Sequence, residues 1–532
     1  MGCTRGYTRL GQDAKPRTCY YLTFLGLVIA VLGVVYLYSA LVSSGQHSNP
    51  AEAQAHSSTF GFPWPQPRLL PFGSKSPYPH QLRNQTFTQE PSPPPIGLSE
   101  SSEQCRLVQV QMVIRHGSRN PNQGTYDDFT AVLDKLRKHW KNSDSRPDPR
   151  VAWLLSYQPH YRTGLSSLTA IGRKDLHRLA NRVYHRYKDF WDSLYPVTNS
   201  GLVADTRNLV LWHTSSSDYN RTIESMYTFM GELFQEIERS SEVIPSLDEG
   251  YQVDIVPRDM DRLLNPHYGC DAWRDISRGP TGKAHIYAER KHLERRHFPA
   301  IMSRLKSLLG YSKLTPTDVY TLYKMCAFDN ANHPERRQTP CILFEGQEEE
   351  LAILEYWGEF RYYQQYGYGA IRPFARRLSC VLMESILEEM DQCSTPDLPP
   401  LDGRKSCQRG RFWFGHSATI AFLSNYLGLD MDEQGDMSGD VPLDHIRNRT
   451  FQSSRMVPFS ANIAFELYQC STNDPSAPKS RYQIRVMRNE EPVVPNHTAC
   501  DQVTGICQLD QMRWDSSGAQ QCDLPKVCHL AT

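Results

Sequence analysis

Short apolar runs of strand length recur along the chain, and helical patterns follow them. The first three runs read "RLVQVQMVIRHG", "NLVLWHTSS" and "RFWFG". The later stretches 168–191, 219–237 and 416–429 read as helices. In the first of these, the residues with helical spacing are Leu176, Leu179, Val183, Tyr187 and Phe190. Strands that alternate with helices predict an α/β fold with helices on both faces of a sheet.

The second half of the chain extends this pattern. Residues 283–391 are mostly helical in pattern. Two further strands are predicted at 461–470 and 480–489, with a turn rich in Asp, Pro and Ser between them. We therefore expect a helical second lobe, inserted at about 240–400, beside the sheet.

One segment is apolar enough to cross a membrane. Residues 20–42 carry no charge, and a spanning helix needs roughly 20 such residues. The basic residues before it are Arg5, Arg9, Lys15 and Arg17. Because a basic flank stays in the cytosol, a single-pass type II anchor is predicted, with a cytosolic tail at 1–19. The rest of the chain would lie in the secretory lumen or at the cell surface; the alternative is a cleaved signal peptide.

The segment after the anchor has the composition of a stem. Residues 43–104 are rich in Pro, Ser, Gln and His, and such a segment is expected to bury no core. The globular domain is therefore expected at 105–510, followed by a Cys-containing tail at 511–532.

Cysteine usage indicates an oxidising compartment. Of the 14 Cys, Cys3 and Cys19 precede the predicted anchor and twelve follow it. An even number predicts up to six disulfides. The last four Cys, from 500 to 528, lack the short C-x2-C pairs of zinc ribbons, so disulfides are favoured over zinc. The sequons that predict a glycoprotein are at Asn84, Asn220, Asn448 and Asn496.

Charge is balanced overall, so a partner must be recognised by a local cluster. The 58 Lys and Arg equal the 58 Asp and Glu, which gives no global field that favours nucleic acid. Polar residues follow the three predicted strands, namely Arg115, His116 and Arg119, then Asp218 and Arg221, then His416. Ligands of open α/β sheets bind beyond the carboxyl ends of the strands. If these strands are neighbours, two imidazoles and three guanidinium groups form a pocket for a phosphate.

Several motifs resemble one enzyme family. "RHGSRNP" at 115–121 resembles the RHGxRxP signature of the histidine acid phosphatases. "SSDYNRT" at 216–222 resembles their S-T-D-x-x-R-T motif, and "LTAIG" at 168–172 resembles their L-T-x-x-G helix start. The segments 326–369 and 454–495 are similar to the multiple inositol polyphosphate phosphatase branch. The resemblance covers roughly 105–510 and implies a histidine-phosphatase (phosphoglycerate-mutase-like) sheet core.

The resemblance also implies roles. His116 would attack phosphorus to form a phosphohistidine, which water then hydrolyses. The residues implied to bind the phosphate oxygens are Arg115, Arg119 and Arg221, and His416 would donate to the developing charge. No metal or other cofactor is implied, and the partners would be a small phosphomonoester and the membrane. Asn220 belongs to this site, so its sequon is not expected to carry a glycan.

One position departs from the family pattern. The second His of the family is followed by Asp or by Ala-Glu, whereas His416 is followed by Ser417 and Ala418. The missing acid protonates the leaving alkoxide, a contribution of about 10²- to 10⁴-fold in rate. Asp218 is the candidate substitute. The favoured hypothesis is an inositol polyphosphate phosphatase with residual activity; the alternatives are a pseudophosphatase that binds phosphorylated ligands, a general acid phosphatase, or a glycosylated structural ectodomain.

Overall fold

The computed structural model describes most of the chain beyond residue 70. The described residues are 71–79, 104–161, 164–194, 212–240, 251–334, 336, 338–369, 371–394, 407–432, 435–471, 481–512, 522, 524 and 528. All of them lie within one compact unit, Trp64–Thr532.

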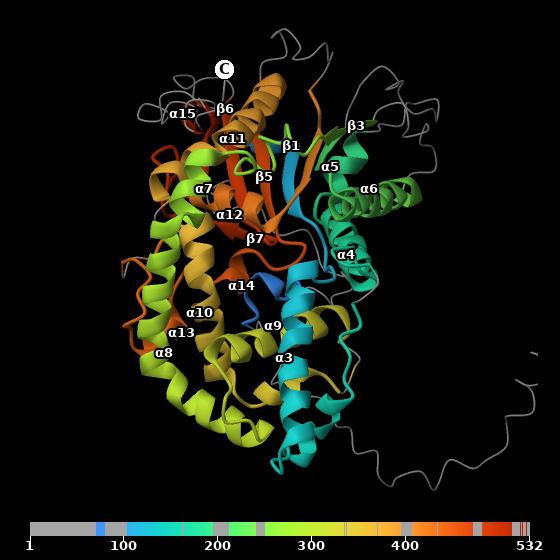
Figure 1. The fold of residues 1–532 in the computed structure, drawn as a ribbon. Helices are drawn as coiled ribbons and strands as arrows, with labels where there is room; N and C mark the ends of the chain where they lie inside the picture. Colours follow the sequence, from blue (N-terminus) through green and yellow to red (C-terminus); the bar gives the residue numbers. More distant parts are fainter. Residues whose placement is uncertain are drawn as a thin grey trace, which may run out of the picture. The chain divides into compact units, whose positions relative to one another are not determined.

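An eight-stranded sheet runs through the middle of the described residues (Figure 1). Its strands are β1 (Gln104–Arg115), β2 (Trp212–Ser217), β3 (Tyr251–Val256), β4 (Gly410–Gly415), β5 (Asn462–Ser471), β6 (Arg481–Arg488), β7 (Glu491–Val493) and β8 (Ile506–Gln508). Their order is β3-β2-β4-β1-β5-β6-β7, and β8 pairs with β6. The pairs among β1 to β4 are parallel, and the pairs that involve β5 to β8 are antiparallel. The α/β prediction is confirmed, although β3, β7 and β8 were not predicted.

The central strands are apolar on both faces because helices cover both. Along β1, Val113 belongs to one core, whereas Met112 and Ile114 belong to the other. On β4, Trp413 and Phe412 divide between the two cores in the same way. This explains why the two strands read as nearly continuous apolar runs rather than as an alternation.

Each core has its own set of helices. The core of Met112 and Ile114 includes α4 (Ala170–Arg186), α5 (Lys188–Ser193) and α6 (Asn220–Ser240). The other includes α3 (Gln123–Asn142), α8 (Pro280–Leu309), α9 (Pro316–Asn332), α10 (Glu348–Tyr366), α11 (Arg372–Ser394) and α12 (Ser417–Tyr426). The shorter elements are α7 (Asp271–Arg278), α13 (Leu443–Asn448), α14 (Ser453–Met456), α15 (Leu509–Met512) and the 3-10 turns η1 (Gly73–Lys75), η2 (Pro149–Leu155) and η4 (Pro340–Phe344). The helix predicted at 168–191 is two helices, because Tyr187 takes φ −114° between α4 and α5.

The long helices of the predicted lobe are present. The pairs α8 with α10 and α8 with α9 pack against each other (Figure 1). In the part of the chain that the structure describes, no helix combines the length and the apolar character needed to span a bilayer. The anchor predicted at 20–42 lies outside that part and stays a prediction.

Part of the predicted stem packs into the body of the protein. Within 43–104, the segment 71–79 buries Phe72 and Tyr78 almost completely, at 2% and 1% exposure. The hydroxyl of Tyr78 donates to Glu490 Oε1 at 2.6 Å. The expectation that the stem buries no core is wrong for this segment, because two aromatic side chains bury enough apolar area to hold a short polar stretch.

Six disulfides join the twelve Cys that follow the predicted anchor, which confirms that prediction. The pairs are Cys105–Cys470, Cys270–Cys528, Cys326–Cys341, Cys380–Cys522, Cys393–Cys407 and Cys500–Cys507. The last four Cys do not cluster together, since Cys522 and Cys528 bond to α11 and to the residue before α7. Such a disulfide set is typical of a secreted or lumenal domain.

The turn after β1 lies directly against the start of α4. A Cβ on Gly117 would lie 2.4 Å from the carbonyl oxygen of Gly172, and a Cβ on Gly172 would lie 2.2 Å from that of Ser118. The backbone nitrogen and the hydroxyl of Thr169 both donate to Ser118 O, at 2.9 and 3.0 Å. The "LTAIG" and "RHG" segments therefore depend on each other, since only glycine permits this approach.

We expect Gly172→Ala to destabilise the protein, although Ala normally favours a helix over Gly by about 1 kcal/mol. The added methyl group must displace the backbone of Ser118, at a cost of about 1–3 kcal/mol. Gly231→Ala in α6 is the matched control, because nothing lies within 4 Å of a Cβ there. Thermal unfolding should show opposite shifts for the two variants. Equal shifts would contradict the contact.

Candidate active site

Three neighbouring strands deliver the predicted site residues to one edge of the sheet. β4 lies between β2 and β1, and the three strands are parallel. Arg115 at the end of β1 pairs in register with Gly415 at the end of β4. His116 and His416 follow directly, and their ring centroids lie 5.7 Å apart. The neighbouring strands that the phosphate-pocket hypothesis requires are therefore present.

One nitrogen of the His116 ring is held by its own loop. Nδ1 lies 2.9 Å from Gly117 O, and because a carbonyl oxygen only accepts, Nδ1 donates and carries the proton. Nε2 is then unprotonated. Burial and the nearby Arg221 guanidinium hold the pKa of His116 well below its usual value. The neutral ring that results is the nucleophilic form.

His416 has the opposite tautomer. Its Nδ1 lies 3.3 Å from Arg221 Nη2, and because a guanidinium only donates, Nδ1 accepts and Nε2 carries the proton. This Nε2 is buried and has no hydrogen-bond partner among the described residues. Burial, with Arg221 next in size, also lowers the pKa of His416 well below its usual value. One imidazole thus offers a lone pair, and its neighbour offers a neutral proton donor.

Arg115 is held by groups that leave its charge uncompensated. Its side chain is 1% exposed, and Nη1 donates to Ser74 O at 2.8 Å and to Val457 O. The guanidinium carbon lies 4.4 Å from the centroid of the Phe459 ring. Burial lowers the pKa of Arg115 to about 9. Carbonyl oxygens and an aromatic face position the group without neutralising it.

Arg119 and Arg221 are held in a similar way. Arg119 Nη1 donates to Asn120 O at 2.7 Å, and the Arg221 guanidinium carbon lies 4.6 Å from the centroid of the Tyr219 ring. Burial lowers the pKa of Arg119 to about 9 and lowers that of Arg221 as well. The Nε atoms of both are buried without a hydrogen-bond partner among the described residues. Buried donors without a partner are suited to binding an anion.

No carboxylate in the described part of the chain pairs with the two imidazoles or the three guanidinium groups. Asp218, the candidate substitute acid, lies 3.8 Å from Arg258, and its side chain is 46% exposed. Asp261 is buried, but its oxygens accept from the Ser217 hydroxyl and from Leu264 N. Burial raises the pKa of Asp261. The described residues also contain no group of His, Cys, Asp or Glu placed to hold a metal ion.

The position of the missing acid is apolar. Ala418 lies in the first turn of α12, is 5% exposed, and belongs to an apolar cluster with Trp273 and Phe422. The carbonyl oxygen of Ser417 accepts from the Tyr362 hydroxyl at 2.9 Å. The residues after His416 therefore offer packing and backbone contacts but no carboxylate.

A cavity of about 520 Å³ adjoins the cluster of imidazoles and guanidinium groups, since Arg119 of that cluster and Ser417, the residue after His416, both line it. The cations that line it are Lys75, Arg119, Arg290, Lys324 and Arg361. The carboxylates that line it are Asp128, Glu355 and Glu359. Asp128 already has a cationic partner, because Lys324 Nζ lies 3.1 Å from its Oδ2.

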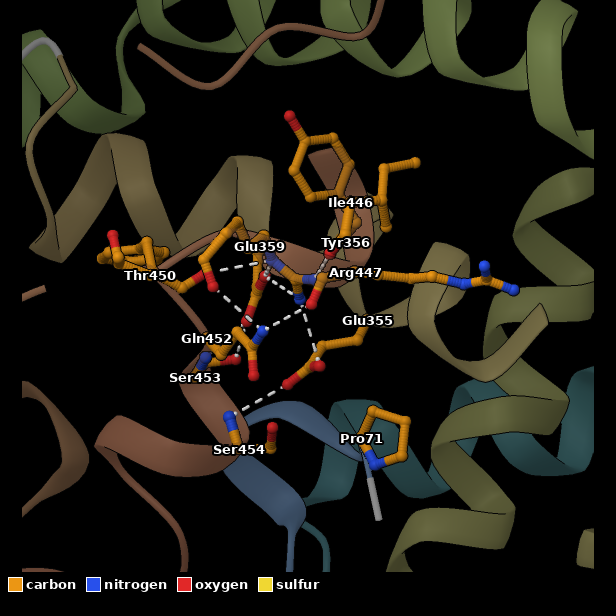
Figure 2. Close-up of polar contacts among 12 residues, drawn as sticks. Pro71, Glu355, Tyr356, Glu359, Ile446, Arg447, Thr450, Gln452, Ser453 and Ser454 are labelled. Carbon is orange, nitrogen blue, oxygen red and sulfur yellow. Dashed lines mark hydrogen bonds and ion pairs between the residues drawn. The ribbon is translucent and has the colours of Figure 1, made fainter. Parts of the chain in front are cut away.

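The two glutamates also have a cationic partner (Figure 2). Arg449 Nη2 lies 2.6 Å from Glu359 Oε2 and 3.1 Å from Glu355 Oε2. The other carboxylate oxygens accept from the Ser453 hydroxyl at 2.7 Å and from Ser454 N at 2.9 Å. Burial raises the pKa of Glu359 to about 8. This network fixes α10 against α14 and leaves the cavity with an excess of positive charge.

The cations beyond the strand ends were not predicted from the sequence. Arg290 and Arg361 lie in the helical lobe, where isolated cations resemble surface residues. Lys75 lies in the predicted stem. The signal that would have located it is the concentration of aromatic and aliphatic residues at 60–78, including Phe72 and Tyr78, within a segment rich in Pro, Ser and Gln.

Comparisons with known proteins agree with the geometry. The sequence profile described as histidine phosphatase superfamily (branch 2) matches residues 106–489. Multiple inositol polyphosphate phosphatase 1 of Gallus gallus is 25% identical over 472 residues, which cover 86% of this chain and 92% of that protein. Phytase A of Aspergillus awamori is 25% identical over 431 residues, which cover 76% of this chain and 81% of that protein.

Solved structures share the fold. The phytase from D. castellii superposes with a TM-score of 0.62 at 17% identity, covering 87% of this chain and 88% of that one. The multiple inositol polyphosphate phosphatase of Bifidobacterium longum, in complex with inositol hexasulfate, has a TM-score of 0.60 at 13% identity. The superposition covers 84% of this chain and 97% of the Bifidobacterium longum chain.

Proposed function

The chain belongs to branch 2 of the histidine phosphatase superfamily, a family of phosphoric monoester hydrolases, and we propose that it hydrolyses inositol polyphosphates. The observation that carries the proposal is the pair of opposite tautomers. His116 presents an unprotonated Nε2 while His416 presents a protonated one, beside three guanidinium groups, one buried and two half-buried, without carboxylate partners among the described residues.

The first step forms a covalent intermediate. The lone pair of His116 Nε2 attacks phosphorus, the bond from phosphorus to the ester oxygen breaks, and that oxygen leaves with the electron pair. Water then attacks the phosphohistidine, releases inorganic phosphate and returns the imidazole. The three Arg and the His416 Nε2–H bind the phosphoryl oxygens, where charge develops in the transition state.

Protonation of the leaving oxygen is the step for which the site lacks an evident general acid. An acid at this step contributes about 10²- to 10⁴-fold in rate. Ala418 supplies none, and the ion pair of Asp218 with Arg258 makes it a poor substitute. We propose that the protein retains residual activity and hydrolyses esters with good leaving groups fastest. A pseudophosphatase that binds without turnover and a general acid phosphatase are the alternatives.

The cavity supports a substrate with several phosphate groups. Little of the negative charge on the carboxylates that line the cavity is uncompensated, because Asp128 pairs with Lys324 and both glutamates pair with Arg449. Arg290 and Arg361 donate instead to the neutral acceptors Trp357 O and Gln365 Oε1. A general acid phosphatase needs charge only around the reactive phosphate, so this excess favours a polyphosphate.

The layout of the chain is part of the proposal. Residues 20–42 anchor the protein as a type II membrane protein, with a cytosolic tail at 1–19. A stem at 43–104, of which 71–79 returns to the body, leads to the phosphatase domain at 105–510, with a helical lobe at about 240–400. The tail at 511–532 is tied to the body through Cys522 and Cys528.

His116→Ala should abolish phosphate release, because no other group supplies the nucleophile. In wild type, a radioactive phosphomonoester should leave an acid-labile label on the protein, which the variant lacks. Since the lowered pKa keeps His116 neutral, activity should persist below about pH 6.5, the usual pKa of His. His177→Ala, at an exposed position of α4, is the control. Full activity of the His116 variant would exclude this mechanism.

Ala418→Glu should accelerate hydrolysis of inositol phosphates by about 10- to 1,000-fold, within the range of acid catalysis. An inositol alkoxide is strongly basic and needs the proton, whereas a nitrophenolate leaves easily and should gain much less. Rates on both esters measure the difference.

Ala418→Gln is the matched control for this experiment, because it adds similar volume to the cluster of Trp273 and Phe422 without an acid. A uniform gain on both esters, or an equal gain with Gln, would point to better folding or binding. No gain, with a wild type already fast on inositol phosphates, would show that another group protonates the leaving oxygen.

The proposed topology has its own test. A tag at the N-terminus should be cytosolic, and a tag after Thr532 should be protected inside intact vesicles. Protease treatment with and without detergent measures both. Digestion of the C-terminal tag without detergent would contradict the type II orientation.

A further inference from the structure

Lys75 reaches the cavity from a segment that precedes the first strand of the sheet. The match to the family profile begins at residue 106, whereas Lys75 ends the 3-10 turn η1. Phe72 and Tyr78, both almost fully buried, fix the segment on either side of it. The side chain of Lys75 lines the cavity together with that of Arg119.

The ammonium group has only neutral partners among the described residues. Lys75 Nζ donates to the Ser74 hydroxyl at 2.7 Å and lies 5.9 Å from the centroid of the Phe328 ring. Burial, followed by the charges of Arg119 and Arg115, lowers its pKa well below the usual value. A cation held next to other cations is costly unless an anion joins them.

The same short segment touches the reactive site. Ser74 O accepts from Arg115 Nη1 at 2.8 Å, and the next residue carries the ammonium group. This hydrogen bond therefore holds the backbone just before Lys75 against the Arg115 guanidinium. An anion at Lys75 would be positioned relative to a phosphate at Arg115 and His116.

Lys324 provides a contrast within the same cavity. It is also a lysine on the lining, but its Nζ lies 3.1 Å from Asp128 Oδ2. Its charge is compensated before any ligand arrives, and an exposed pair of this kind contributes little. Of these two lysines, Lys75 is the one that lacks a carboxylate partner in the described structure.

We propose that Lys75 is a specificity-determining residue that binds a second phosphate group of the substrate while the reactive phosphate lies at His116. The inference rests on the proposed function, because it assumes a substrate with at least two phosphate groups. It assigns substrate recognition to a segment outside the phosphatase domain predicted at 105–510. The chemistry is a charge-assisted hydrogen bond from the ammonium group to phosphate oxygen.

The test compares Lys75→Met, Lys75→Arg and Lys324→Met in the full-length protein. Turnover is measured on inositol hexakisphosphate and on nitrophenyl phosphate, which has a single phosphate group. Lys75→Met should raise KM for the hexakisphosphate by about 10- to 100-fold, the loss expected for a charged hydrogen bond. KM for nitrophenyl phosphate should stay within about 3-fold, Lys75→Arg should recover most of the loss, and Lys324→Met should change little.

Calorimetric binding of inositol hexasulfate, which is not hydrolysed, separates this inference from the proposed function. If wild type binds the hexasulfate without turnover of any ester, the proposed hydrolysis is wrong, and a weaker affinity of Lys75→Met still supports the subsite. Equal affinity of wild type and Lys75→Met overturns the subsite even if hydrolysis occurs. Parallel KM losses on both esters would also overturn it, since they indicate a structural role. Absence of both binding and turnover in wild type overturns both proposals.

Discussion

One buried guanidinium group, two half-buried ones and two buried imidazoles share one edge of the sheet, and burial lowers the pKa of each. Repulsion among the three guanidinium groups opposes folding, and no carboxylate of the described residues pairs with them or with the two neutral imidazoles. Carbonyl oxygens and aromatic faces hold them instead. The arrangement keeps the full positive charge available for an anion, which is what binding a phosphoryl group requires.

The surrounding structure provides the rigidity that such a cluster needs. The Arg449 network ties α10 to α14, and Val457, which follows α14, holds Arg115 through its carbonyl oxygen. In the other of the two cores, Gly172 allows α4 to approach the turn after β1. The disulfide Cys105–Cys470 joins β1 to β5. A displacement of any of these elements would move a charged group out of position.

Binding and chemistry are separable in this site. The groups proposed to hold and attack a phosphate are present, whereas Ala418, two residues after His416, packs in an apolar cluster. Attack on phosphorus and departure of the ester oxygen make different demands, because only the second needs a proton. The dependence of rate on the leaving group is therefore the physical property that distinguishes an impaired enzyme from a binding protein.

The sequence by itself determined the α/β class, the number of disulfides and the cluster at the strand ends. Apolar runs, an even Cys count and short motifs such as "RHG" are local signals, and the topology of parallel strands brings their ends together. Only the tertiary structure decided the tautomers of the two imidazoles and the place of Lys75. Tautomers depend on which group faces each nitrogen across the fold. Lys75 belongs to a segment with the composition of a stem. The segment nevertheless lies against the body of the protein, because the packing of Phe72 and Tyr78 against distant residues outweighs local composition.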